Sequence, residues 1–352
     1  MVVGVAGVAG ASAAGGGSVV VGMVSRLDVY QRRHRWLGLP IAVLYKFVDD
    51  LGGYLASLIT YYGFLSLFPL LLVFSTVLGF LLPGNPQLQQ QLIDSALSQF
   101  PIIGDQLTSS AQPLRGSGSG LVIGILVAVY GGLGLAVAIQ NALNQVWAVP
   151  VSRRPDPVRA RLRSLLLLVL FGIGVLLTTV LSALATAGQE LGPWVRLGAI
   201  ALSVVGNCAL FVLAFRTLTA SPLSIRDVLP GAVMAAIAWP VLQSVGTIYV
   251  DYQLRGSSQV YGLFGIVLGL LAWIYVEALV IVLAAEVNVV LVRRLWPRAL
   301  LAPVKEDVDL THADRRSYES YANAQQYREA ETITVDFEPQ RTKLEDDETR
   351  SS

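Results

Sequence analysis

Residues 260–292 read VYGLFGIVLGLLAWIYVEALVIVLAAEVNVVLV, a run of 33 residues in which Glu277 and Glu286 are the only charged side chains. As an α-helix this run would be about 50 Å long, whereas the hydrocarbon core of a bilayer is about 30 Å thick. Its length and composition therefore predict a membrane-spanning helix with one end in the interface.

Five other apolar stretches approach or exceed the roughly 20 residues that a helix needs to cross a bilayer. They cover residues 55–82, 120–139, 164–186, 197–215 and 228–250. We therefore predict an all-α, polytopic membrane bundle of six transmembrane helices. The composition agrees, because 54% of the residues are hydrophobic and only 14% are charged, against about a quarter charged in soluble domains. Small residues in the later spans favour close helix packing and are compatible with a homo-oligomer.

The basic residues between these stretches alternate in number along the chain. Segments 25–54, 148–163, 216–227 and 293–305 contain 5, 5, 2 and 4 lysines or arginines, whereas the three intervening loops contain one each, Arg115, Arg196 and Arg255. Basic residues close to span ends remain in the cytoplasm. The pattern therefore predicts that both termini are cytoplasmic.

Two segments lie at the ends of the chain, outside the six-span domain that we assign to residues 55–297. Residues 1–24 are rich in glycine, alanine and valine, and we expect a low-complexity, disordered leader, with a seventh span as the alternative. Residues 298–352 form an acidic cytoplasmic tail with few aliphatic side chains. We expect this tail to be mostly disordered, either simply solvated or used for docking, and we expect residues 307–352 to be dispensable for folding.

Amphipathic helices are predicted on both sides of the membrane. The cytoplasmic region 25–54 contains one apolar helical stripe, formed by Ile41, Leu44, Tyr45 and Val48, and this spacing is typical of a helix that lies in the membrane interface. A second apolar stripe runs through residues 88–100, after the turn that follows the first span. It is too short and too polar to cross the bilayer.

Side chains that could perform catalysis are scarce. His34, His312 and Cys208 are far apart in the sequence, so a zinc site of the usual kind is not expected. Two histidines outside the spans also cannot complete a Ser-His-Asp triad inside the bundle. We therefore expect no catalytic residues, no metal site and no cofactor, and a membrane enzyme is the least favoured class.

Carboxyl groups within an apolar helix are costly, so each needs a partner or a function. Glu277 and Glu286 are nine residues apart, which places them on opposite helix faces with separate partners. For Glu286 we expect an ion pair near the cytoplasmic interface, with Arg293 or another basic residue. Glu277 should lie deeper, where a structural and a functional role are equally open, and it is our main candidate for a transport path.

Four amide side chains lie near the cytoplasmic end of the second span. They form two i, i+4 pairs that cover adjacent helix faces, and they are Gln140, Asn141, Asn144 and Gln145. Such amides either form hydrogen bonds between helices or line a hydrophilic cavity. In the second case they would extend the transport path that begins at Glu277.

Several strings resemble the motifs of the YihY family, also called the virulence factor BrkB family. The first is YYGFLSLFPL at residues 61–70, and a later one is Ala285-Glu286-Val287-Asn288, similar to the family's Gly-Ala-Glu-x-Asn ending but with Ala284 where glycine is usual. The resemblance covers residues 40–297. The matching positions are Tyr61, Tyr62, Ser66, Pro69, Trp147, Gly231, Tyr261, Gly262, Trp273, Glu286 and Asn288.

The resemblance implies a multi-pass protein of the bacterial inner membrane with no cofactor. The family was once labelled ribonuclease BN, and relatives have been linked to serum resistance and to the export of envelope lipids. It thus implies membrane lipids as partners, together with envelope-spanning lipid transport proteins, and not nucleic acid. The leading hypothesis is a transporter, or transport component, for an envelope lipid or another amphiphile. The alternative is a non-catalytic scaffold or regulator of envelope machinery.

Overall fold

The computed structural model describes residues 27–81, 118–156, 158–165, 193–257, 262–302 and 309–337, with a few isolated positions, and within these residues it contains helices and no strand. The long helices are α3 (Gly52–Leu81), α6 (Gly118–Val146), α8 (Pro193–Leu218), α9 (Ile225–Ser257) and α10 (Gly262–Arg293). The shorter elements are α2 (Arg35–Asp49), the 3-10 helix η1 (Val151–Arg153) and α11 (His312–Ala324).

Three of the described helices contain segments that are long and apolar enough to cross a membrane, namely Ala201–Leu218, Ile225–Gly246 and Val267–Arg293. Helices α3 and α6 occupy the first and second predicted spans. The prediction of a helical membrane protein is thus confirmed. The number of six spans remains a prediction, because most of the predicted span 164–186 lies outside the described residues. The leader 1–24 and nearly all of the apolar stripe 88–100 also lie outside them.

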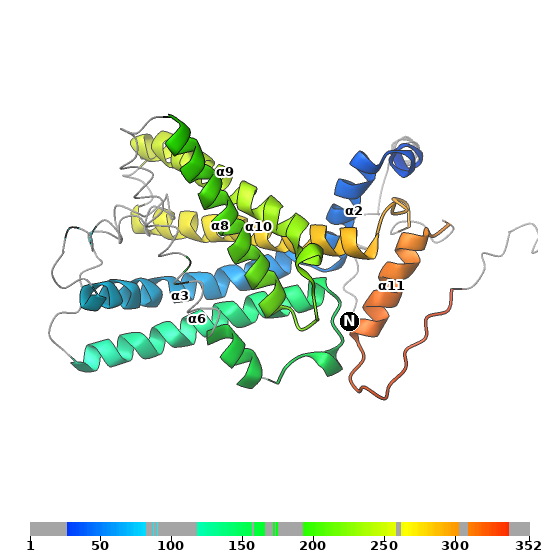
Figure 1. The fold of residues 1–352 in the computed structure, drawn as a ribbon, viewed down its shortest axis with the longest axis horizontal. Helices are drawn as coiled ribbons and strands as arrows, with labels where there is room; N and C mark the ends of the chain where they lie inside the picture. The colour runs from blue at the N-terminus through cyan, green and yellow to red at the C-terminus, as the bar shows by residue number, and fades with distance from the viewer. Residues whose placement is uncertain are drawn as a thin grey trace, which may run out of the picture.

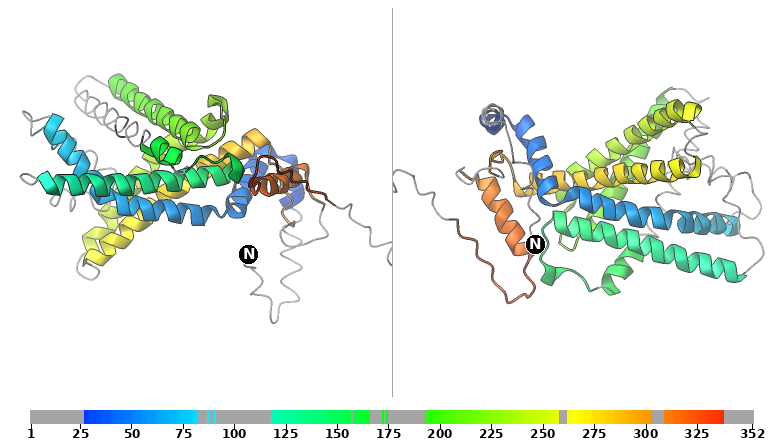
Figure 2. Two further views of the ribbon diagram at one scale, coloured as in Figure 1. Left: turned by 90° about the horizontal axis from the view of Figure 1, so that it is seen from below. Right: turned by 180° about the vertical axis from the view of Figure 1, so that it is seen from behind.

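The long helices converge at one end and spread apart at the other, as Figures 1 and 2 show. Helix α3 packs against both α6 and α10, while α9 packs against α10 and α8. Helix α2 lies at the converging end and packs against α10, and α11 lies at the same end (Figure 1). The first and last described parts of the chain therefore meet at one end of the bundle.

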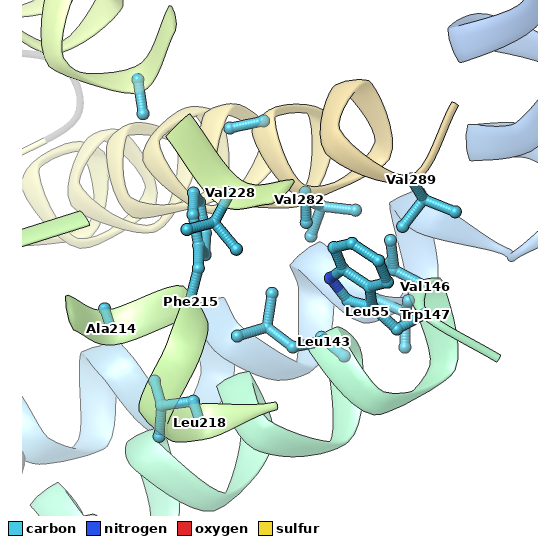
Figure 3. Packing of buried hydrophobic residues seen from close by; sticks show 14 of the residues in the cluster. Leu55, Leu143, Val146, Trp147, Ala214, Phe215, Leu218, Val228, Val282 and Val289 are labelled. Carbon is cyan, nitrogen blue, oxygen red and sulfur yellow. The ribbon is translucent and has the colours of Figure 1, made fainter. Parts of the chain in front are cut away.

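Among the described side chains, the buried apolar core lies where the helices converge (Figure 3). It includes Leu55 of α3, Val146 of α6, Phe215 of α8 and Val289 of α10. Large apolar side chains are instead exposed along the outer faces of the long helices, among them Tyr130, Trp194, Val205, Ile237, Val241 and Val245. Helices that are apolar on both their packed and their outer faces are typical of a membrane bundle.

Helices α9 and α10 approach each other closely at Gly231. A Cβ atom at this position would lie 2.0 Å from the carbonyl oxygen of Ala284, and the backbone amide of Gly231 donates a hydrogen bond of 2.6 Å to Oδ1 of Asn288. The approach therefore depends on the glycine of α9, and the alanine at 284 is compatible with it. Small residues at contact points are what helix packing in lipid requires.

Helix α2 confirms the predicted amphipathic helix before the first span. Leu44 and Val48 of its apolar stripe are 57% and 69% exposed, so this stripe is available to the membrane interface. The opposite face packs against the bundle and buries Ala42, Val43 and Lys46. The helix therefore has one face that packs against the bundle and one face that is exposed.

The C-terminal tail differs from our prediction of a mostly disordered segment, whereas its dispensability for folding stays a prediction. Residues 312–324 form α11, which begins with a capping box between Thr311 and Asp314. Asp314 is buried and pairs with Arg298 at 2.7 Å. The prediction was wrong here because it considered only apolar burial, whereas α11 is held by a cap and by a buried ion pair. Residues 338–352 lie outside the described residues.

Replacing Gly231 by alanine tests the close approach of α9 and α10. We expect Gly231→Ala to destabilise the protein by about 1–3 kcal/mol, the usual effect of overpacking, and to lower its thermal midpoint in detergent. The matched control is Gly198→Ala in α8, where a Cβ atom would meet nothing within 4 Å. That control should keep or raise the midpoint, because alanine is the better helix former. Equal midpoints for the two variants would contradict the close approach.

Candidate functional site

Glu277 is a buried carboxyl group on α10 and is held by neutral donors. The indole nitrogen of Trp273, one turn earlier, donates a hydrogen bond of 2.8 Å to Oε1 of Glu277. The side-chain amide of Gln243 on α9 donates a longer one of 3.5 Å to the same atom. Among the ion pairs of the described residues, none includes Glu277. The carboxyl group thus lies between α9 and α10, and no cation among the described residues contacts it.

The amide cluster of α6 does not contact Glu277 in the described structure. Gln140 donates hydrogen bonds to Ser164 and to the carbonyl of Ala160, and Oδ1 of Asn144 accepts one of 2.7 Å from the amide of Ala220. Gln145 donates one of 2.8 Å to the carbonyl of Asp50, while Asn141 is exposed. Three of these four amides therefore join α6 to neighbouring segments.

The basic partner of Glu286 is Lys46 of α2. The sequence predicted a basic partner from the cytoplasmic segments but did not indicate which residue it is. The two side chains are 2% and 0% exposed, and Nζ of Lys46 lies 3.4 Å from Oε2 of Glu286. The same ammonium binds Asp50 and donates a hydrogen bond of 2.9 Å to the carbonyl of Val146. As their spacing predicted, Glu277 and Glu286 have separate partners. The cluster joins α2, α6 and α10.

Arg293, the other proposed partner of Glu286, instead binds neutral groups. Its guanidinium donates to the carbonyl of Trp147 and, at 3.1 Å, to the hydroxyl of Ser320. Arg316 of α11 reaches back to the carbonyl of Arg293 at 3.3 Å. These contacts attach α11 to the ends of α6 and α10.

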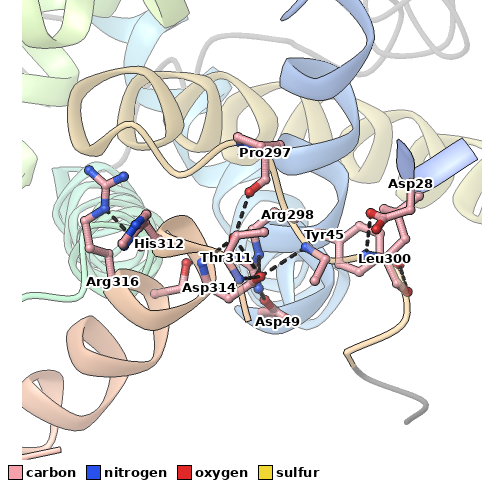
Figure 4. A network of polar contacts seen from close by, with 12 residues as sticks. Asp28, Tyr45, Asp49, Pro297, Arg298, Leu300, Thr311, His312, Asp314 and Arg316 are labelled. Atoms are coloured by element: carbon pink, nitrogen blue, oxygen red, sulfur yellow. Dashed lines mark hydrogen bonds and ion pairs between the residues drawn. The ribbon is translucent and has the colours of Figure 1, made fainter. Parts of the chain in front are cut away.

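Arg298 is the centre of a second charged network, which sequence reasoning missed (Figure 4). Its guanidinium binds Asp49 at 2.8 Å, Asp314 at 2.7 Å and the hydroxyl of Ser317 at 2.9 Å. Asp314 also accepts a hydrogen bond of 3.0 Å from the amide of Ala299. The capping-box spacing of Thr311 and Asp314 was the one available signal for a helix here.

Burial and ion pairing have opposite effects on the pKa values of Arg298 and Asp49. Burial alone would lower the pKa of Arg298, but Asp49 and Asp314 raise it above the ordinary arginine value. Burial also raises the pKa of Asp49, although the guanidinium of Arg298 acts in the other direction. Arg298 therefore remains charged and holds two carboxyl groups from opposite ends of the sequence.

The segment before α2 is attached to the same network. Oδ1 of Asp28 accepts a hydrogen bond of 3.1 Å from the amide of Leu300, and the hydroxyl of Tyr45 donates one of 2.8 Å to the carbonyl of Leu300. Gln31 donates to the carbonyl of Arg298. Residues 298–300 thus connect the start of the described chain to its last helix (Figure 4).

The remaining motif positions lie mainly at contacts between helices. A Cβ atom at Gly131 of α6 would come within 2.9 Å of Cα of Ser66, and one at Gly134 within 2.6 Å of the Tyr62 ring. Tyr61 is exposed. Pro69 lies within α3 and Gly262 begins α10, while Tyr261 lies outside the described residues. In the part of the chain that is described, no three His, Cys, Asp or Glu side chains group as a metal site.

Comparison with known proteins gives a family match and several bacterial relatives. The family model described as virulence factor BrkB matches residues 43–308. The inner membrane protein YhjD of Escherichia coli (strain K12) is 28% identical over 251 residues, which cover 65% of this chain and 74% of that protein.

Two further relatives have different descriptions. The putative ribonuclease-like protein YfkH of Bacillus subtilis (strain 168) is 27% identical over 67% of this chain and 88% of its own length. A UPF0761 membrane protein of Pseudoalteromonas atlantica is 26% identical over 66% of this chain and 79% of its own length. No solved structure matches the chain.

Replacing Asp314 by asparagine tests the attachment of α11. Loss of one partner of a buried ion pair costs about 3 kcal/mol, so we expect α11 to detach locally before the bundle unfolds. Trypsin cleavage of the purified protein at Arg315 and Arg316 should then be roughly a hundredfold faster. Glu319→Gln is the matched control, because Glu319 is an exposed carboxylate on the same helix. Equal cleavage rates in both variants would show that the ion pair does not hold α11.

Proposed function

We propose, because the chain belongs to the virulence factor BrkB family, that this membrane protein is a transporter, or a transport component, for an envelope lipid or another amphiphile. The main support for this proposal is the position of Glu277. A carboxyl group in a span is costly unless it is paired or hydrated, and the contacts of Glu277 come from the neutral donors Trp273 and Gln243. Such a group can accept a hydrogen bond from a polar headgroup or exchange a proton.

The family position of Trp273 supports a specific role for this carboxyl group. Trp273 fixes Oε1 of Glu277 through its indole N–H, and Gln243 approaches the same atom from the adjacent helix α9. A headgroup that inserts between α9 and α10 would compete for this oxygen with the longer and weaker of the two contacts. Glu277 would then act at the boundary between two spans.

We propose a cytoplasmic location for the converging end of the bundle, with six spans and both termini in the cytoplasm of a bacterial cell. The predicted cytoplasmic segments contain 5, 5, 2 and 4 basic residues, and α2, the end of α6, the start of α9 and the end of α10 all lie toward this end (Figure 1). Basic residues at span ends favour this orientation.

A non-catalytic scaffold is the second candidate, and the contacts of α6 favour it. Gln140, Asn144 and Gln145 bind neighbouring segments, so these amides support a packed bundle rather than a polar path. The name of YfkH suggests a nuclease, but His34 and His312 are too isolated in this sequence to form the metal site of such an enzyme. We therefore do not assign nucleic acid as a substrate.

Reporter fusions test the proposed orientation. A reporter that is active only in the periplasm should be active after Pro101 or Gln253 and silent after Asp156 or Lys305. The reason is the excess of lysine and arginine in the segments assigned to the cytoplasm. The reverse pattern of activity would overturn the orientation. Activity at all four positions would overturn the six-span topology.

Replacing Glu277 by glutamine tests the transport hypothesis. The protein is reconstituted in liposomes that contain NBD-labelled phosphatidylglycerol, and lipid movement is measured by dithionite bleaching, with and without an imposed proton gradient. We expect wild-type protein to move the labelled lipid and Glu277→Gln to be slowed at least about tenfold, equivalent to about 1.4 kcal/mol of lost stabilisation.

Abundance and thermal midpoint serve as controls for this variant. Both should stay close to the wild-type values, because glutamine keeps the shape of the side chain and its oxygen acceptor. Glu319→Gln, on the exposed face of α11, should move lipid like the wild type. A wild-type protein that moves no lipid under either condition would support the scaffold, and a fully active Glu277→Gln would remove Glu277 from the path.

A further inference from the structure

A surface pocket of about 310 Å³ lies where the end of α10 meets α11. Its lining side chains are mainly polar, and they are Arg293, Leu295, Arg316, Glu319, Ser320 and Asn323. The volume falls at the lower end of the roughly 300–1,000 Å³ that small-molecule sites occupy. Two of the lining groups are guanidinium groups, which can donate hydrogen bonds but cannot accept them. The pocket therefore suits an anionic ligand.

Hydrogen bonds hold the two guanidinium groups in place. Nη1 of Arg293 donates to the hydroxyl of Ser320 at 3.1 Å, and that hydroxyl donates to the carbonyl of Arg316 at 2.7 Å. The guanidinium of Arg316 in turn donates to the carbonyls of His312, at 3.1 Å, and Arg293, at 3.3 Å. Arg293, Arg316 and Ser320 are therefore linked to each other before any ligand binds, which lowers the entropic cost of binding.

Both guanidinium groups retain N–H donors that no described residue engages. A guanidinium has five N–H groups. Arg316 uses two of them, for the carbonyls of His312 and Arg293. Arg293 also uses two, for Ser320 and for the carbonyl of Trp147. Among the ion pairs between described side chains, none includes Arg293 or Arg316. Each guanidinium can therefore bind an anion without giving up a contact within the protein.

Carboxylates near the pocket oppose an anion but are outnumbered by arginines. Glu319 lines the pocket and is exposed, so solvent screens its charge. Asp50 interacts electrostatically with Arg293, but it is buried and paired in the cluster that joins α2, α6 and α10. Arg294 and Arg315 are exposed and adjacent in sequence to the two lining arginines. Four arginines therefore attract an anion more strongly than these two carboxylates repel it.

We propose that this pocket binds a phosphate group, carried by a lipid headgroup at the membrane surface or by a soluble phosphate ester. Two guanidinium groups match the oxygens of a phosphate group, and Ser320 and Asn323 add uncharged polar groups. Arg293 ends the apolar segment Val267–Arg293, so the pocket lies where the last predicted span leaves the bilayer. Most of the lining residues belong to α11, outside the family match at residues 43–308. The site is independent of the transport proposed above.

Isothermal titration calorimetry of the full-length protein in a neutral detergent tests the pocket. The soluble probe is glycerol 3-phosphate, with glycerol as its phosphate-free control, and the lipid probe is dihexanoyl phosphatidic acid. We expect binding that requires the phosphate group and is at least about tenfold weaker in Arg316→Gln, which removes a charged donor. Arg315→Gln is the matched control, because Arg315 is an exposed neighbour on α11 that does not line the pocket. It should change the affinity by less than about fivefold.

The two probes distinguish the sources of the phosphate group. Binding of the soluble probe, with or without the lipid probe, would assign the pocket to phosphate esters in general, and binding of the lipid probe alone would assign it to a headgroup. Binding of neither probe would overturn the proposal, as would equal affinities of Arg316→Gln and Arg315→Gln. Without probe, Arg316→Gln should keep the wild-type thermal midpoint, because Arg316 is exposed. If its midpoint falls, Arg316→Lys replaces it, and an unchanged affinity of that variant would overturn the proposal.

Discussion

Burial of the Lys46 ammonium is the constraint on which the arrangement of the other described elements depends. A buried cation must find acceptors, because the loss of its hydration is not otherwise offset. Lys46 finds them in the Asp50 carboxyl group, the Val146 carbonyl and Glu286. These acceptors come from the end of α2, the end of α6 and the last turns of α10, so these three elements must meet at one place. The convergence of the bundle at this end follows from that requirement and from the apolar core beside it.

The polar contacts of Arg298 and Arg293 connect this cluster to further parts of the described chain. Arg298 holds Asp49 and Asp314, and Arg293 connects the end of α6 with α11 through Trp147 and Ser320. Both arginines use acceptors that are distant in sequence. The charged residues Lys46, Asp50, Glu286, Arg298 and Asp314 near the converging end are buried and paired. Charged side chains therefore stabilise the fold here, in addition to favouring one orientation in the membrane.

Much of the fold could be predicted from the sequence, because the apolar runs are long and hydrophobic length is the main requirement of a membrane helix. The described helices α3, α6, α8, α9 and α10 occupy five of the predicted spans. The separate partners of Glu277 and Glu286 also followed from helical periodicity. Helix α11 was missed because its stability comes from single contacts of Asp314 with Arg298 and of Thr311 with the carbonyl of Pro297, and no local sequence pattern indicates these partners.

The candidate site was less predictable than the fold. Periodicity placed the amides of α6 on two faces, but whether they line a cavity or bind a neighbour depends on which segments lie opposite. Ser164 and Ala220 supply those contacts, and both come from loops or helix ends whose positions only the folded chain defines. Lys46 could not be identified as the partner of Glu286 either, because in the sequence it is one basic residue among several before the first span.

The contacts of Arg298 also determine the order in which the protein can be completed during synthesis. Asp28 and Asp49 leave the ribosome early, whereas Leu300, Arg298 and Asp314 are made after the last span. Chains fold from the N-terminus as they are synthesised, so Asp49 lacks its partner Arg298, and Asp28 lacks its contact with Leu300, until the last span has been made. A chain that stops before residue 298 would lack both contacts. The docking of α11 at this end therefore requires synthesis of the chain at least through residue 324.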